Sequence, residues 1–164
     1  MKKNFLMGLG VVLMSIGATR SFAQKSASGS DYQTAIGLGI DVGDGGTLVG
    51  PSIKHFFTEN SVGAGELLFG NHTVAVQAFY QYHREFDGAE GLRWFAGGGP
   101  SFQFYSYRGF NQADIALVPM GGLDYKIPDV PLSFSFDWRP NLFLTHGSGI
   151  NAARFGLGFR YAFN

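Results

Sequence analysis

The fold of this chain is decided by its last stretch, residues 151–164, which reads NAARFGLGFRYAFN. Two sets of side chains alternate along it. The apolar set is Ala153, Phe155, Leu157, Phe159, Tyr161 and Phe163. The small or cationic set is Ala152, Arg154, Gly156, Gly158, Arg160 and Ala162. Successive side chains of a strand point to opposite faces, so the stretch predicts a strand with one apolar and one polar face. The aromatic face packs on a core in a soluble protein, or contacts lipid in a membrane barrel that holds the arginines in its lumen.

The beginning of the chain predicts a cleaved secretory signal. A positively charged start is followed by an apolar run over residues 5–18 and by small residues at Ser21 and Ala23. The apolar run has about 14 residues, fewer than the roughly 20 that a spanning helix needs, which disfavours an uncleaved anchor. The chain therefore divides into a signal peptide (1–23), an N-terminal lead (24–32) and a barrel domain (33–164).

Composition excludes a nucleic-acid-binding role and fits a membrane barrel. Without Lys2, Lys3 and Arg20, nine basic and twelve acidic residues remain, a net charge of −3 that offers nucleic acid no basic surface. The chain has no cysteine, so its stability has another source, which a closed barrel in a membrane supplies. Its 25 glycines and 17 phenylalanines suit strands that coil tightly and present aromatic residues to lipid.

Turn residues divide the mature chain into eight predicted strands. Most have about 10–13 residues, close to the 9–11 that a tilted membrane-spanning strand needs and longer than the 5–6 that is usual in soluble proteins. An even number of strands lets the last pair with the first, which leaves no exposed edge. The predicted ranges are 33–42, 47–58, 61–70, 73–84, 92–107, 115–127, 132–144 and a last strand that follows the loop 145–150.

Three local expectations follow from this division. Pro100 falls inside the fifth strand, where a bulge at Gly97–Gly99 would relieve the missing hydrogen bond. Gly109–Asp114 is expected to be a loop. With the N-terminus in the periplasm, the turns at 58–61, 85–91 and 128–131 are periplasmic, and the loops at 43–46, 70–72, 108–114 and 145–151 face outward. All are short, which argues against an adhesin or receptor with long loops.

The polar faces of the strands predict a lumen filled by charged side chains. An eight-stranded barrel is just wide enough for its own side chains, and charges buried there must pair. The predicted lumenal network is Lys54, Glu66, Arg93, Asp124, Lys126, Asp137, Arg139, Arg154 and Arg160. The predicted interfacial anchors are Tyr80, Tyr82, Trp94, Trp138, Tyr161 and Phe163. We expect the fold to be an all-β, eight-stranded, antiparallel, up-and-down transmembrane β-barrel.

Two stretches carry a resemblance to a known family, GLRWFAGGGPSF at 91–102 and DYKIPDVPLSFSFDWRPNLFL at 124–144. They resemble the small outer-membrane barrels of Bacteroidota, of the outer-membrane-protein β-barrel type related in shape to OmpX and OmpA. The resemblance covers nearly the whole mature chain and implies an integral protein of the cell outer membrane. It also implies insertion by the barrel-assembly machinery, which reads a terminal aromatic residue. Here Phe163 is penultimate and Asn164 is last.

The expected role is structural or interaction-type, for a monomer in outer-membrane lipid without catalysis, metal or cofactor. A competing hypothesis is an enzyme that modifies lipid A or phospholipid through His146 and Ser148, whose H-x-S spacing is similar to that of outer-membrane lipid A deacylases. That family follows the serine with asparagine and has a later acid, whereas here Gly149 follows. Two further hypotheses are a narrow pore lined by arginines and a soluble periplasmic barrel that binds lipid inside. His83, without a second ligand at metal spacing, is interpreted as an interfacial polar residue.

Overall fold

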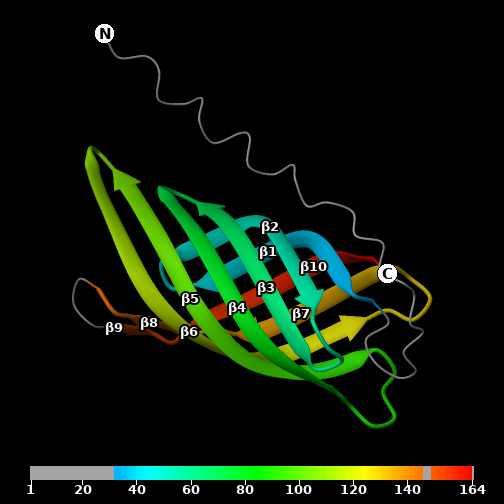
Figure 1. The fold of residues 1–164 in the computed structure, drawn as a ribbon. Coiled ribbons are helices and arrows are strands. Elements are labelled where there is room, and N and C mark those ends of the chain that lie inside the picture. Colours follow the sequence, from blue (N-terminus) through cyan, green and yellow to red (C-terminus); the bar gives the residue numbers. More distant parts are fainter. Residues whose placement is uncertain (1–31, 146–148, 164) are drawn as a thin grey trace.

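The computed structural model describes residues 32–145 and 149–163, so the predicted signal peptide and most of the N-terminal lead lie outside the described residues. All regular structure in the described part is β-strand (Figure 1). No helix there is long and apolar enough to cross a membrane. The strands are β1 (Thr34–Gly43), β2 (Gly46–Phe56), β3 (Ser61–Gly70), β4 (Thr73–Glu85), β5 (Leu92–Tyr107), β6 (Phe110–Lys126), β7 (Leu132–Trp138), β8 (Asn141–Phe143), β9 (Gly149–Asn151) and β10 (Arg154–Phe163).

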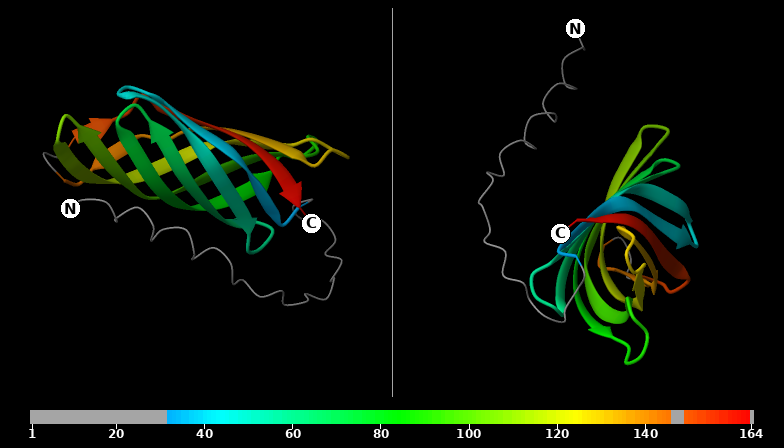
Figure 2. Two further views of the ribbon diagram at one scale, coloured as in Figure 1. Left: turned by 90° about the horizontal axis from the view of Figure 1, so that it is seen from above. Right: turned by 90° about the vertical axis from the view of Figure 1, so that its right-hand side faces the viewer.

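These ten segments form the eight strands of one closed antiparallel barrel (Figure 2). We call each of these eight barrel strands a stave, because two of them are made of two segments each. β7 continues into β8 as one stave, and β9 continues into β10 as another. β1 pairs with both β2 and β10, and the pairing of β5 with β6 completes the ring. Each stave therefore lies beside its neighbours in sequence. The predicted all-β, eight-stranded, antiparallel, up-and-down barrel is confirmed.

The staves are strongly staggered around the ring. A path that follows paired residues once around the barrel leaves the first stave at Gly43 and returns to it at Gln33, ten residues lower. Closure with such a stagger tilts strands by about 35–45° from the axis and leaves an interior that side chains alone can fill. We call the end with Thr34 and Phe163 the terminal end, and the end with the β1–β2, β3–β4 and β5–β6 turns the hairpin end.

The longest hairpin corrects one predicted loop. β6 begins at Phe110 rather than near 115, and residues 110–114 pair with residues 103–107 of β5. The loop expected over 109–114 is thus a two-residue turn, Arg108–Gly109, in which both residues have positive φ (47° and 86°). Two such residues match the strand twist of a tight hairpin. The β5–β6 hairpin extends past the β3–β4 turn at the hairpin end (Figure 1).

Pro100 lies within β5 without the bulge expected at Gly97–Gly99. β5 keeps one register with β4 on both sides of Pro100, and the ladder lacks the pairs that would involve Ala78 and Phe79. Proline has no N–H to donate, so the ladder opens at that point. A Cβ on Gly99 would lie 1.9 Å from the Ala78 carbonyl oxygen. Close approach of two backbones therefore takes the place of an inserted residue.

The last two staves are less regular than the predicted strands. The strand expected over 132–144 is interrupted at Arg139–Pro140, although β7 and β8 keep the same register against β6. In that register Pro140 lies opposite Pro119 of β6, and neither residue can donate to the ladder. Between β9 and β10 the register shifts by one residue at Ala152–Ala153, as in a β-bulge.

The polarity of the two faces of the barrel is the reverse of that in a soluble protein, because the outside is apolar and the inside is charged. Every stave exposes large apolar side chains on its outer face, among them the aromatic set of β10. The inner face buries most of the charged side chains, together with three small apolar clusters. The largest apolar cluster contains Phe79, Phe95, Val118 and Met120. The aromatic side chains of residues 155, 159, 161 and 163 thus point away from the interior.

Candidate functional site

The centre of the lumen is filled by an ionic cluster that we call the central network: Ser52, Glu66, Asp137, Arg139 and Arg160. Arg139 donates to Asp137 through two nitrogens, Nε to Oδ1 at 2.6 Å and Nη2 to Oδ2 at 2.8 Å. Its Nη1 donates to Glu66 Oε2 at 2.6 Å, and Arg160 Nη2 donates to Glu66 Oε1 at 3.1 Å. Arg160 also donates to Ser52 and Ser135. Both carboxylates are thus paired by fixed guanidinium forks, as buried charges require.

A second ion pair lies toward the hairpin end. Arg154 Nε donates to Asp41 Oδ1 at 2.9 Å, and Arg154 Nη1 donates to the Asp44 carbonyl oxygen at 2.8 Å. Gln77 connects this pair to the central network. Its Nε2 donates to Asp41 Oδ2 at 3.3 Å, and its Oε1 accepts from Arg139 at 3.4 Å. Polar contacts are therefore continuous from the middle of the lumen to Asp44.

A third cluster closes the lumen toward the terminal end. Lys54 Nζ donates to Asp124 Oδ2 at 2.9 Å, and the Tyr32 hydroxyl donates to the same oxygen at 3.2 Å. His83 Nδ1 lies 3.7 Å from that oxygen, and the His83 ring stacks on Phe95 with centroids 4.8 Å apart. Tyr32 also packs edge-on against Phe56. Charged and aromatic groups together fill this part of the lumen.

Tyr32 precedes the first strand and reaches into the barrel. Its side chain is buried. Burial, reinforced by the nearby Asp124 carboxylate, raises the pKa of the Tyr32 hydroxyl far above its usual value. The hydroxyl therefore remains a neutral hydrogen-bond donor. Residues 24–32 were predicted to form an extended N-terminal lead, and the single aromatic side chain at its end was the available signal that it enters the barrel.

Eight of the nine predicted lumenal residues are buried, and Lys126 is the exception. Lys126 is half-buried and donates to the Ile127 carbonyl oxygen at 3.0 Å. Arg93 pairs with Glu85, whose side chain is 57% exposed, so this contact lies at the rim of the terminal end. The interpretation of His83 as interfacial is wrong, because its side chain is fully buried in the lumen. A functional role for the predicted set stays a prediction.

Asp41 was not among the predicted lumenal residues, although it pairs with Arg154. The signal was present, because Ile36, Leu38, Ile40 and Val42 alternate with it and place it on the opposite, inner face of β1. The predicted interfacial aromatics all lie on the outer surface. They are Tyr80, Tyr82, Trp94, Trp138, Tyr161 and Phe163.

The weak catalytic pair, His146 and Ser148, lies outside the described residues. Next to it, Thr145 Oγ1 donates to Asp114 Oδ1 at 3.1 Å and accepts from the Ile115 N–H at 3.0 Å. Among residues 32–145 and 149–163, no group of three or more His, Asp or Glu side chains could hold a metal ion. The chemical groups of the described site are ion pairs between side chains that are buried in the lumen.

Comparison with known proteins agrees with this architecture. No protein-family model matches the chain, and no curated protein matches it. Among solved structures, the N-terminal β-barrel domain of Pseudomonas aeruginosa OprF is similar, with a TM-score of 0.62 and 20% identity over 79% of this chain and 98% of that domain. Neisserial surface protein A has a TM-score of 0.46 and 14% identity over 80% of this chain and 95% of that protein. The chain therefore shares the barrel fold of the OprF domain.

Proposed function

We propose that this chain is an integral outer-membrane β-barrel protein with a sealed lumen and a structural or interaction role. The carrying observation is the polarity of the barrel. Aromatic and aliphatic side chains cover the outside of all eight staves, while charged side chains are paired inside. Soluble proteins rarely expose apolar patches larger than a few hundred Å². Lipid around the barrel is the solvent that fits such a surface, and the closed ladder satisfies the backbone.

A sealed lumen favours this role over a pore. Three successive groups of polar contacts occupy the interior, centred on Asp41, Glu66 and Asp124. Arg139 and Lys54 are only 2% and 1% exposed. In an open channel, such charged side chains would be in contact with water. The same polar filling disfavours a soluble barrel with lipid inside. The shared fold of the OprF domain supports the outer membrane as the location.

We also propose that the chain works as a monomer that contacts outer-membrane lipid and is inserted by the barrel-assembly machinery. The closed ring supports a monomer because every stave already has two neighbours. The exposed Phe163 supports recognition of the last stave during assembly.

Fractionation combined with a heat-modifiability gel tests the location. The outer-membrane fraction is extracted with detergent and run boiled and unboiled. A closed barrel resists the denaturing detergent until it is heated, so we expect a mobility shift confined to that fraction. Recovery of the unshifted protein in the soluble periplasm would refute the proposal. Recording in planar bilayers tests the sealed lumen, and regular conductance steps above background would show a pore.

A further inference from the structure

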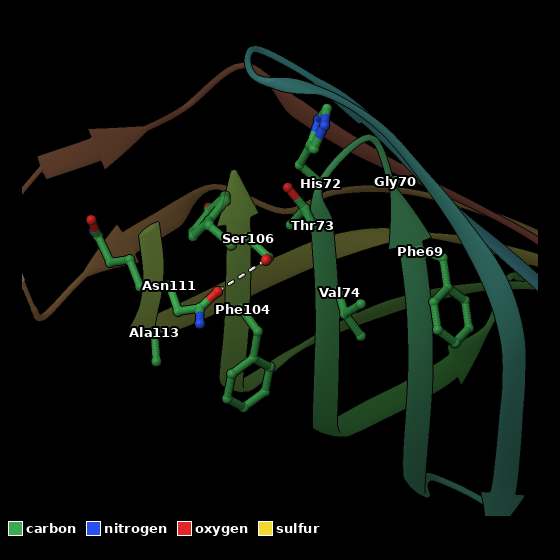
Figure 3. A pocket seen from close by; sticks show the side chains of 11 residues that line it. Phe69, Gly70, His72, Thr73, Val74, Phe104, Ser106, Asn111 and Ala113 are labelled. Carbon is green, nitrogen blue, oxygen red and sulfur yellow. Dashed lines mark hydrogen bonds between the residues drawn. The ribbon is translucent and has the colours of Figure 1, made fainter. Parts of the chain in front are cut away.

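A groove of about 510 Å³ lies on the outer face of the barrel at the hairpin end (Figure 3). It crosses β3, β4, β5 and β6, and the β5–β6 hairpin forms its far wall. None of the side chains that line it is a Lys, Arg, Asp or Glu. Its outward-facing lining residues form two rows that differ in polarity, one apolar and one polar.

The apolar row is made of Phe69, Val74, Phe104 and Ala113. These residues are successive cross-strand partners, because Phe69 pairs with Val74, Val74 with Phe104, and Phe104 with Ala113. Their side chains point to the same side of the sheet in Figure 3. Neighbouring strands lie about 4.8 Å apart, so a row across four strands is about 14 Å wide. That width exceeds one acyl chain and accommodates chains lying side by side.

The polar row lies one to two residues closer to the hairpin end. It contains His72, Ser106 and Asn111. Ser106 Oγ donates to Asn111 Oδ1 at 2.9 Å, which leaves the Asn111 amide hydrogens available. The row presents imidazole, hydroxyl and amide groups and no Lys, Arg, Asp or Glu side chain. Such groups hydrogen-bond to sugar hydroxyls and amides, whereas clusters of Arg and Lys bind phosphate.

The two rows lie where the apolar outer face ends. Toward the terminal end, the outer face of the same strands continues with exposed Leu67, Val76 and Phe102. Beyond the polar row, the β5–β6 turn at Arg108–Gly109 extends past the β3–β4 turn. If the outer face contacts lipid, as proposed above, this boundary is the level of the lipid head groups.

We propose that the groove binds a glycolipid with several acyl chains, which lie along the apolar row while its sugar head contacts the polar row. The inference rests on the proposed membrane location. Continuity with the lipid-facing surface supplies the acyl chains, and the uncharged polar row selects a sugar head. An anionic phospholipid lacks a cationic partner among the lining residues. A second barrel is the competing occupant.

Lipid retention measured by native mass spectrometry tests the groove. The full chain is reconstituted in phosphatidylcholine nanodiscs that contain equal mole fractions of dephosphorylated lipid A, whose sugar head is uncharged, or of phosphatidylglycerol. We expect dephosphorylated lipid A to remain bound preferentially. Ala113→Trp fills the apolar row and is expected to reduce the retained glycolipid at least about fivefold, while Leu38→Trp, on β1 across the ring from β5, changes it by less than about twofold. Asn111→Leu is expected to abolish the preference for this glycolipid over phosphatidylglycerol.

Each other result overturns the site in an identifiable way. Equal loss with Ala113→Trp and Leu38→Trp means that lipid binds the barrel without using the groove. Equal retention of the two lipids by the unmodified chain excludes recognition of a sugar head, and a dimer mass that Ala113→Trp abolishes assigns the groove to a second copy. Heat-modifiability of each variant reports folding separately. A chain that never inserts refutes both proposals, whereas an inserted chain without preference refutes only this one.

Discussion

Removal of Arg139 from the lumen is expected to destabilise the barrel far more than removal of Arg93. Arg139 is 2% exposed and holds two carboxylates, Asp137 through a bidentate contact and Glu66 through Nη1. Arg139→Met leaves the Asp137 charge without its hydrogen-bond partner in the interior. Breaking one side of a buried pair costs about 3–5 kcal/mol, because the remaining charge is uncompensated.

Arg93→Met is the matched control. Arg93 is itself buried, but its partner Glu85 is 57% exposed and remains hydrated when the arginine is lost. We therefore expect a loss of less than about 1 kcal/mol from this ion pair. Both substitutions keep a long, flexible side chain that covers the aromatic ring beneath it, Phe79 for Arg139 and Phe56 for Arg93.

Urea unfolding in lipid vesicles, followed by tryptophan fluorescence and by the heat-modifiability gel, gives both free energies of unfolding. The double variant Arg139→Met with Asp137→Asn removes the stranded charge. It should be more stable than Arg139→Met alone, with a coupling of about 0.5–3 kcal/mol. If Arg139→Met costs no more than Arg93→Met, paired charges in the lumen do not contribute to stability in the way proposed.

Three further outcomes are expected. Gly99→Ala should lower the heat-modifiable fraction, because the added Cβ would overlap the Ala78 carbonyl oxygen. Gly121→Ala should be tolerated, since the atom nearest to its added Cβ would be 3.7 Å away. Equal heat-modifiable fractions for the two variants would contradict the close approach at Gly99. Leu38→Arg should lower the free energy of unfolding in vesicles by about 2–4 kcal/mol, whereas Tyr107→Arg, near the β5–β6 turn, should leave it almost unchanged. Unfolding of both variants in urea measures the difference. Brominated lipids should quench Trp94 and Trp138, which are 36% and 50% exposed; unquenched emission would place the outer face away from lipid.

The alternation of side chains predicted the staves where the outer face is apolar and failed where it is not. Residues 110–114 read FNQAD and carry no apolar alternation, yet they pair with β5. Residues 110 and 111 pair with residues 107 and 106, past the neighbouring β3–β4 turn, where no continuous apolar face is needed. His83 was interpreted as an interfacial residue, although its alternation with Gln77 and Gln81 places it on the inner face.

Which lumenal residues form ion pairs with one another could not be predicted from the sequence, for a geometric reason. Arg139 and Glu66 are 73 residues apart in sequence and lie on staves that are not adjacent. Alternation states that both side chains point inward, but the stagger of the ring decides which residues reach the same level. A stagger different by two residues would keep every side chain on its face and still change the partners. The list of lumenal residues was therefore accessible, and their pairing was not.

Two Gly-Pro pairs show why proline does not end a strand in this barrel. Pro100 follows Gly99, and in β2 Pro51 follows Gly50, where the pairs that would involve Leu67 and Leu68 are likewise missing. In each register the carbonyl that would accept from the absent proline N–H belongs to Ala78 or Leu67. A Cβ on the preceding glycine would lie within 2.0 Å of that same oxygen, so the glycine Cα–H points at it instead. Such a weak Cα–H···O contact partly compensates a carbonyl that lipid cannot solvate. Gly37, Gly97 and Gly122 approach a neighbouring carbonyl oxygen about as closely without a following proline. The glycine therefore marks the close approach of two staves, and the proline that follows it leaves the register unchanged.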